Sequence, residues 1–380
     1  MKPVKAFLYG YYGTNNLGDD LLLSAVIRNL KEMSADILLS VRCLEVPLHI
    51  DDVQVTFVQI EKVMANQRLS KIHRLAKYAI GVWRSLHGCQ IFVFGGGTLF
   101  HSQKNSYVNL IFILMWVIAA RLRGARVYSL GVGVATLCTW FARTIQKLII
   151  SLSEDFAVRD KSSLLNCSFR MAAEKKIRQT SDLIFAEKIY RNTDNDRLRT
   201  ARVLGVTLAA SDFDLRQEKC QRTLRALAES IACLAREGWD IHLLSFQEPI
   251  GTSEISDLSL FTNLQLLCPD VSMHHRKLVP DPIAIADQYA QLSVIVGMRF
   301  HGHVLAAMQS VPFVGLSDDG KVTDLCGAFN MPIFSIGGFA SEVLVNSIIQ
   351  TQAVRPNLRE LNELISKASN NYASLKREFL

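Results

Sequence analysis

The run Gly297-Met298-Arg299-Phe300-His301 places an arginine and a histidine two positions apart, directly after the apolar segment 293–296. A short apolar run that stops at a glycine predicts a buried strand, and the following residues predict a helix. In that setting Arg299 supplies a fixed cation for a phosphate or carboxylate, and His301 supplies a group that transfers protons near neutral pH. The pair therefore indicates the catalytic site of an enzyme that acts on an anionic substrate.

A glycine- and asparagine-rich loop, residues 10–20, connects the first predicted strand to the first predicted helix. Glycines let the backbone approach a ligand, and a helix N-terminus presents unpaired N–H groups. The glycine spacing differs from the dinucleotide-binding fingerprint. The alternative is an ordinary strand-to-helix turn that Asp19 caps. The substrate-binding residues that this loop predicts are Asn15, Asn16, Gly18 and Asp19.

Other chemically suited residues also follow predicted strands. Ligands of open α/β sheets bind at the carboxyl ends of strands, so Gly96, Gly97 and Thr98 are predicted to contact substrate. Arg159 follows another strand and suits an anion, although the alternative is a surface arginine beside Asp160. Two further candidate substrate-binding residues are Asp182, as a partner for Arg159 or a sugar hydroxyl, and Lys321, as another cation.

Short apolar runs alternate with amphipathic segments along most of the chain, which predicts mostly parallel sheets with helices on both faces. We expect strands at 4–9, 37–43, 54–58, 90–94, 126–130, 155–158, 203–208, 240–245, 294–296 and 313–316. We expect helices at 19–33, 69–86, 107–122, 137–152, 218–236, 282–292 and 300–309. The polar segment 187–202 predicts an interdomain linker. The expected organisation is a Rossmann-like domain at 1–190, a second at 191–355, and a helical tail at 356–380.

Composition excludes several classes of protein. The 380 residues carry a formal net charge of +7, but basic runs with interleaved aromatics are absent, which argues against nucleic-acid binding. The eight scattered cysteines form no CxxC pair, so we expect reduced thiols, no metal and a cytoplasmic location. The apolar segment 107–120 predicts a buried helix. The alternative is a helix that lies on a membrane surface, with basic residues following it.

Taken together, these motifs resemble the polysaccharide pyruvyl transferase family. The resemblance extends over about residues 4–321 and rests on the order of the loop glycines, the glycine triplet at 95–97, Val158-Arg159-Asp160, Asp182, Arg299-x-His301 and the stretch 312–321. It implies a glycosyltransferase-B-like fold, in which two Rossmann-like domains face a central cleft. It also implies transfer of the pyruvyl group of phosphoenolpyruvate onto two hydroxyls of a sugar, which forms a pyruvate ketal.

The resemblance further implies roles for these residues. Arg299 and His301 match the family's Arg-x-His motif, and Arg159 matches its strand-end arginine. In this scheme both arginines, with Lys321 in reserve, hold phosphoenolpyruvate, and His301 is the acid/base. The N-terminal domain takes the acceptor and the C-terminal domain the donor, without a metal or cofactor.

The expected acceptor is a sugar of an exopolysaccharide or other surface polysaccharide, or its lipid-linked oligosaccharide precursor. A lipid-linked acceptor would bring the enzyme to the inner face of the membrane as a peripheral protein. The alternative enzyme is a nucleotide-sugar-dependent glycosyltransferase of the same fold. A non-catalytic binding or assembly protein is a third class, and the Arg299-x-His301 pair argues against it.

Overall fold

The computed structural model describes residues 3–47, 50, 52–60, 70–101, 107–167, 176–187, 189, 201–210, 213–247 and 256–379. The described chain divides into two compact units. Unit 1 contains 1–14, 19–186 and 364–380, and unit 2 contains 15–18 and 187–363. Most of the expected linker, 188 and 190–200, lies outside the described residues.

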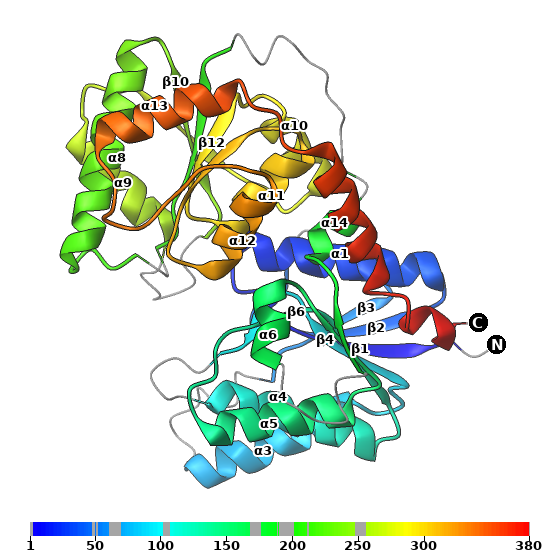
Figure 1. The fold of residues 1–380 in the computed structure, drawn as a ribbon. Coiled ribbons are helices and arrows are strands. Elements are labelled where there is room, and N and C mark those ends of the chain that lie inside the picture. Colours follow the sequence, from blue (N-terminus) through cyan, green and yellow to red (C-terminus); the bar gives the residue numbers. More distant parts are fainter. Residues whose placement is uncertain are drawn as a thin grey trace. The chain divides into compact units, whose positions relative to one another are not determined.

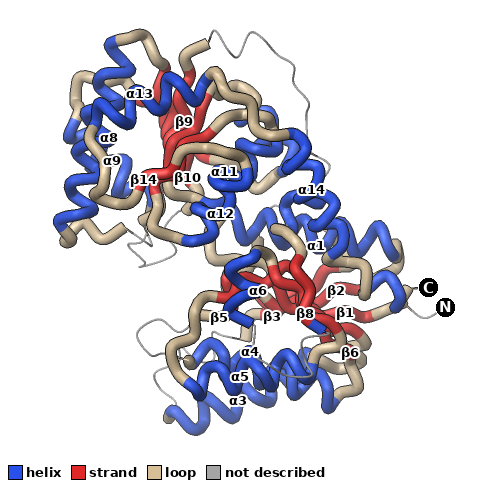
Figure 2. Tube along the Cα trace, viewed as in Figure 1, coloured by secondary structure: helices blue, strands red, loops and turns tan. Residues whose placement is uncertain are grey.

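Unit 1 is built on a parallel sheet, whose strands are red in Figure 2. Its strand order is β3-β2-β1-β4-β6-β7-β8, and β5 pairs with β6 beside this path. The first strand of the chain, β1, occupies the third position in this order, and helices connect the neighbouring parallel strands. This arrangement is expected when apolar strands alternate with amphipathic helical segments. The strands are β1 (Lys5–Tyr9), β2 (Leu38–Arg42), β3 (Val55–Val58), β4 (Ile91–Gly95), β5 (Thr98–Phe100), β6 (Arg126–Val134), β7 (Asp155–Val158) and β8 (Ile177–Gln179).

The helices of unit 1 are α1 (Leu17–Met33), α3 (Lys71–Ser85), α4 (Val108–Leu122), α5 (Trp140–Leu152) and α6 (Lys161–Cys167). Helices α3, α4 and α5 form one layer on one face of the sheet, and α1 lies on the other face (Figure 1). The first layer packs through an aromatic core. The buried Trp116 of α4 lies 4.7 Å from the ring of Phe7 and donates a hydrogen bond to the hydroxyl of Tyr78.

Two expectations for unit 1 are corrected. The strand expected to stop at Gly131 continues to Val134, because a register shift against β7 and the positive φ of Gly131 let the strand bend and continue. Thr98, for which no strand was predicted, begins β5 and pairs with Gly133. The sequence pattern missed β5 because it has only three residues, too few to display a period.

Unit 2 has a six-stranded parallel sheet with the order β11-β10-β9-β12-β13-β14. Its strands are β9 (Val203–Thr207), β10 (Asp240–Ser245), β11 (Met273–Lys277), β12 (Val294–Gly297), β13 (Phe313–Leu316) and β14 (Ile333–Phe334). Its helices are α8 (Glu218–Arg236), α9 (Asp257–Leu267), α10 (Pro282–Tyr289), α11 (Phe300–Met308), α12 (Gly320–Ala328) and α13 (Ser341–Gln352). Helices α8, α9 and α13 share the main apolar core of this unit.

The C-terminal tail returns to unit 1. Helix α14 (Leu358–Asn370) and the short 3-10 helix η4 (Leu375–Glu378) end the chain. Thr180 donates a hydrogen bond of 2.8 Å to Asn371, and Arg178 donates one of 3.0 Å to the carbonyl of Asn370. These bonds explain why contacts assign 364–380 to unit 1, whereas the sequence suggested a separate tail from 356.

Among the described residues, no helix is long and apolar enough to cross a membrane.

His303 of α11 is a fully buried histidine that makes the core of unit 2 sensitive to acid. Burial lowers its pKa from 6.5 to about 4. The folded state therefore binds this proton more weakly than the unfolded state, and the free energy of unfolding falls as the pH drops from 6.5 toward 4. The loss is about 3 kcal/mol for this group.

The measurement is urea unfolding of wild type and His303→Gln at pH 7 and pH 4.5. The wild type is expected to lose more stability than the variant over this interval. The comparison is needed because Asp20 acts in the opposite direction: burial raises its pKa from 3.8 to about 6, so it favours the folded state as the pH falls. Equal pH dependence in both proteins would contradict the prediction.

Candidate active site

Both sheets have the strand order that creates a switch point next to their first strand. In unit 1, β1 lies between β2 and β4, and in unit 2, β9 lies between β10 and β12. Crossovers leave the first strand in opposite directions, so the loops at the carboxyl ends of these strands separate, and this is the position at which open α/β sheets generally bind ligands. The predicted glycine loops and the Arg299-x-His301 run all lie at such strand ends.

In unit 1 the two glycine-rich loops that follow β1 and β4 lie against each other. Tyr12 donates a hydrogen bond of 3.0 Å to the carbonyl of Gly95. A β-carbon built on Gly97 would lie 2.9 Å from the Oδ1 of Asp19, and the φ of Gly97 is +79°. Only glycine allows this backbone geometry without strain and leaves room for the carboxylate, so these residues share one site.

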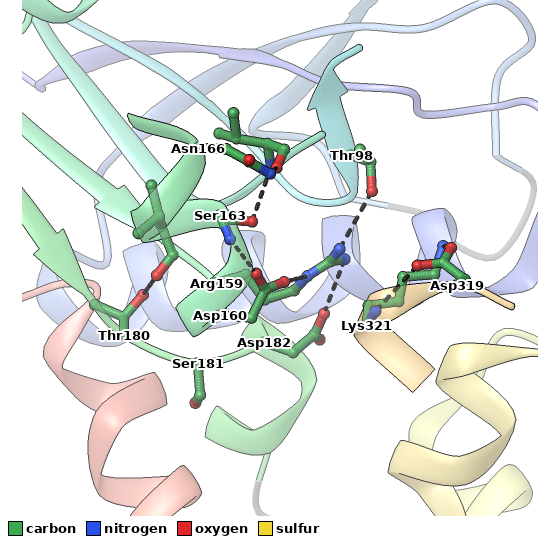
Figure 3. Close-up of polar contacts among 12 residues, drawn as sticks. Thr98, Arg159, Asp160, Ser163, Asn166, Thr180, Ser181, Asp182, Asp319 and Lys321 are labelled. Carbon is green, nitrogen blue, oxygen red and sulfur yellow. Dashed lines mark hydrogen bonds and ion pairs between the residues drawn. The ribbon is translucent and has the colours of Figure 1, made fainter. Parts of the chain in front are cut away.

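Arg159 joins the same region from the end of β7 (Figure 3). Its side chain is buried, with 4% exposed, and it donates hydrogen bonds of 3.2 Å to Thr98 Oγ1 and to Asp160. Its Nη1 lies 3.7 Å from Asp182 Oδ2, and Asp182 Oδ1 accepts from the backbone N–H of Ile184. We call Asp19, Gly97, Thr98, Arg159 and Asp182 the unit 1 cluster.

The unit 1 cluster holds more negative than positive charge. Its one cation, Arg159, faces the carboxylates of Asp160 and Asp182, while Asp19 approaches the same glycine triplet. Carboxylates accept hydrogen bonds from hydroxyls and repel phosphates. The cluster is therefore chemically suited to a sugar.

In unit 2, Arg299 is the N-cap residue of α11 and is held by a carboxylate that the sequence analysis missed. Its Nη2 donates hydrogen bonds to Asp257 and to Gln247, and its Nε donates to the carbonyl of Leu208 at 3.0 Å. The side chain of Asp257 has no exposed surface, and that of Arg299 is 10% exposed. The guanidinium is thus fixed in direction, with Nη1 outside these three bonds.

His301 lies in the first turn of α11, where it meets a segment from the start of the chain. A β-carbon on Gly18 would overlap the Nδ1 of His301, so no larger residue fits at position 18. Leu17 donates a hydrogen bond of 2.8 Å to the carbonyl of Phe246, and Asn16 pairs with Gln247 in an antiparallel bridge. Contacts consequently assign 15–18 to unit 2. We call Gly18, Asp257, Arg299 and His301 the unit 2 cluster.

The remaining predicted residues have weaker structural support. Asn15 has a left-handed φ of 50° and an exposed side chain in the same segment, which suits a turn residue. Lys321, for which no helix was predicted, lies in the first turn of α12, and its ammonium group pairs with Asp319 at 2.9 Å (Figure 3). Asp319 also caps this helix through the backbone N–H of Lys321, so the pairing is local.

Three residues of unit 2 escaped sequence analysis. Gln247 follows β10, whose end was predicted, whereas Asp257 follows the N-cap residue Ser256 at the start of α9, a helix that the sequence pattern did not predict. Thr207 ends β9, and its buried hydroxyl has no hydrogen-bond partner among the described residues. The Thr207 hydroxyl lies beside Gly297 and Gly302, because a β-carbon added to either glycine would come close to its oxygen. The described part of the chain holds no group of three or more potential metal ligands.

Two Rossmann-like domains define the class of fold, and solved structures share it. The UDP-GlcNAc 2-epimerase of Methanocaldococcus jannaschii is 13% identical with a TM-score of 0.62, and the alignment covers 98% of this chain and 99% of that one. The Neisseria meningitidis UDP-GlcNAc 2-epimerase bound to UDP-GlcNAc is 12% identical with a TM-score of 0.59, over 98% and 100%. Anabaena HepE in complex with UDP-glucose is 12% identical with a TM-score of 0.54, over 99% and 98%. The fold is glycosyltransferase-B-like, as expected.

Within this fold class the chain belongs to the polysaccharide pyruvyl transferase family, whose model matches residues 16–320. The matched span contains both clusters, from Gly18 to His301, and also Asn16. Asn15 and Lys321 lie just outside it. No curated protein matches the chain. The family resemblance predicted from the motifs is confirmed.

Proposed function

We propose that this protein transfers the pyruvyl group of phosphoenolpyruvate onto two hydroxyls of one sugar and forms a cyclic ketal. The sugar belongs to a surface polysaccharide or to its lipid-linked precursor. Membership of the pyruvyl transferase family supports the reaction class. The main structural observation behind this proposal is that His301 contacts Gly18 and lies beside Arg299, whose guanidinium is held in one direction by Asp257.

The two clusters differ in charge, and this difference assigns the substrates. Phosphoenolpyruvate carries a phosphate and a carboxylate, so the acidic unit 1 cluster would repel it. In the unit 2 cluster, Asp257 balances Arg299, and the Nη1 of Arg299 can donate to an incoming anion. We therefore assign the donor to unit 2, and the sugar to Asp19, Thr98 and Asp182 of unit 1. Arg159 then acts as a positioning residue that holds Asp182.

The reaction balances in two steps. One sugar hydroxyl adds to C2 of the enol, its oxygen forms a C–O bond, and a proton reaches C3, which becomes a methyl group. The second hydroxyl then attacks C2, the bond from C2 to the phosphate oxygen breaks, and its proton leaves with inorganic phosphate. In this scheme the imidazole of His301 carries these protons, and Arg299 steadies the departing phosphate. The scheme requires no metal or cofactor, and the eight free thiols fit a reducing, cytoplasmic location.

The test is thermal unfolding of the purified protein with phosphoenolpyruvate, beside UDP-GlcNAc, UDP-glucose and inorganic phosphate. Phosphoenolpyruvate at about 100 times its dissociation constant is expected to stabilise the protein by about 2.7 kcal/mol. Phosphate release from phosphoenolpyruvate should follow only when an acceptor sugar is added. Stabilisation by phosphate alone to the same extent would show that the carboxylate is not recognised.

The second candidate is a nucleotide-sugar-dependent glycosyltransferase. It is favoured by the fold of the similar structures, two of which are complexes with UDP-GlcNAc or UDP-glucose. The same experiment separates the two, because stabilisation by a UDP-sugar and none by phosphoenolpyruvate would favour the glycosyltransferase and overturn pyruvyl transfer.

A further inference from the structure

Helices α3, α4 and α5 form one layer of unit 1 (Figure 1), and large apolar side chains of this layer are exposed. Its inner side is buried in the core of unit 1, through residues such as Val82 and Trp116. Its outer side carries large apolar side chains, and we define the outer face by six of them: Ile72, Trp83, Val108, Leu122, Trp140 and Leu148. Such a gathering marks a site of interaction rather than an ordinary solvated surface.

The exposure of these side chains is high and comes from all three helices. Ile72 of α3 is 79% exposed, Leu122 of α4 is 72% exposed, and Trp140 of α5 is 76% exposed. On α4 the exposed Val108, Ile111, Ile118 and Leu122 recur at helical spacing, opposite the buried side. A helix that is apolar on both sides contacts one apolar partner with each side.

Aromatic side chains gather at the N-terminal ends of α4 and α5. The ring of Tyr107 lies 4.9 Å from that of Phe141, and Phe141 lies 6.0 Å from Trp140. All three are exposed, although each is large enough to fill a core. Aromatic rings with one polar atom concentrate at the headgroup level of membranes, where one end is apolar and the other is wet.

The charged side chains of these three helices are all basic. Helices α3, α4 and α5 contain no Asp or Glu, and they contain four, one and two Lys or Arg residues respectively. Arg123, just after α4, stacks at 4.1 Å on the ring of the exposed Trp83, which places a cation at the apolar face. One nearby acid, Glu154, pairs with Arg121 at 2.6 Å. Basic and aromatic groups around an apolar face match a surface of anionic lipid.

We propose that this outer face binds the surface of an anionic lipid bilayer, on which the protein lies without crossing it. A second copy of the chain is a poorer occupant, because a two-fold dimer would place the same basic groups opposite one another. The inference does not rest on pyruvyl transfer, since binding is measured without phosphoenolpyruvate or acceptor. A bilayer surface would, however, bring a lipid-linked acceptor to the enzyme.

The test is co-flotation of the full-length protein with phosphatidylcholine vesicles, with and without phosphatidylglycerol. Binding is expected only with phosphatidylglycerol, and it should weaken with added salt. The double variant Leu122→Glu/Trp140→Glu removes apolar surface and adds repulsion, and should reduce the bound fraction at least about tenfold. Both side chains are highly exposed, so its urea midpoint should equal that of the wild type.

The matched control is Leu266→Glu/Ile283→Glu, which adds the same charge at two exposed apolar positions of unit 2. It should bind vesicles like the wild type. Equal loss in both variants would show a general effect of charge and would overturn the proposal. The proposal would also be overturned if the wild type does not bind vesicles but is a dimer by light scattering, while the Leu122→Glu/Trp140→Glu variant is a monomer. That result would show that the outer face binds a second copy of the chain.

Discussion

Replacing Arg299 by alanine is expected to destabilise the protein by about 3–5 kcal/mol, which is more than the loss of one contact would explain. Asp257, its partner, has no exposed surface, so the substitution leaves a buried carboxylate without its cation. Backbone N–H groups of Ala210, Phe246 and Gln247 still donate to Asp257, but they do not neutralise it. The free energy of unfolding, measured in urea, should fall accordingly.

The control is Arg216→Ala, which breaks an ion pair with Asp214 on the surface, where the arginine side chain is 91% exposed. Little change is expected there, because water and salt screen such pairs. In a double-mutant cycle, Arg299→Ala and Asp257→Asn should be strongly non-additive, since each breaks the same pair. If Arg299→Ala cost no more than Arg216→Ala, the pairing with Asp257 would not stabilise the fold.

Replacing His301 by asparagine is expected to lower pyruvyl transfer by about 10²- to 10⁴-fold, the range that a general acid or base contributes. The half-buried imidazole lies in the first turn of α11 beside Arg299, so a smaller amide removes the proton carrier with little effect on packing. Stabilisation by phosphoenolpyruvate should persist in the variant, because binding is assigned to Arg299. The measurements are phosphate release with acceptor sugar and thermal unfolding with phosphoenolpyruvate.

Gly18→Ala provides a second test of the same role. A methyl group at position 18 would overlap the Nδ1 of His301, so the imidazole must move although it is still present. Transfer should fall in this variant too, while His275→Asn, at an exposed histidine of β11, should leave it unchanged. Full transfer by a folded His301→Asn variant would remove His301 from the mechanism.

Much of the fold was predictable because its signals are local. Apolar runs of four to six residues between amphipathic segments marked the long strands and helices that the structure contains. The elements that escaped, such as β5 and β14, have two or three residues and no detectable period. Helix α9 and strand β11 also escaped, because 256–277 mixes apolar and polar residues without a clear repeat.

The candidate residues were predictable for a related reason. In a parallel α/β sheet the carboxyl ends of strands meet at one edge, so a strand-end position already implies a place in the site. This reasoning selected Thr98, Arg159 and His301 as candidates without any contact information, and their roles stay predictions. It did not reveal that the ammonium group of Lys321 pairs with Asp319, the cap residue of its own helix.

The sequence by itself determined the family, the alternation of strands and helices, and the strand ends that carry reactive side chains, because these depend on residue order alone. Only the tertiary structure decided which charges meet. Arg159 and Thr98 are separated by 61 residues, and Arg299 and Asp257 by 42, yet each pair is in contact. A carboxylate is a solvated surface group until packing excludes water from it. The role of each arginine therefore depends on burial that no local pattern encodes.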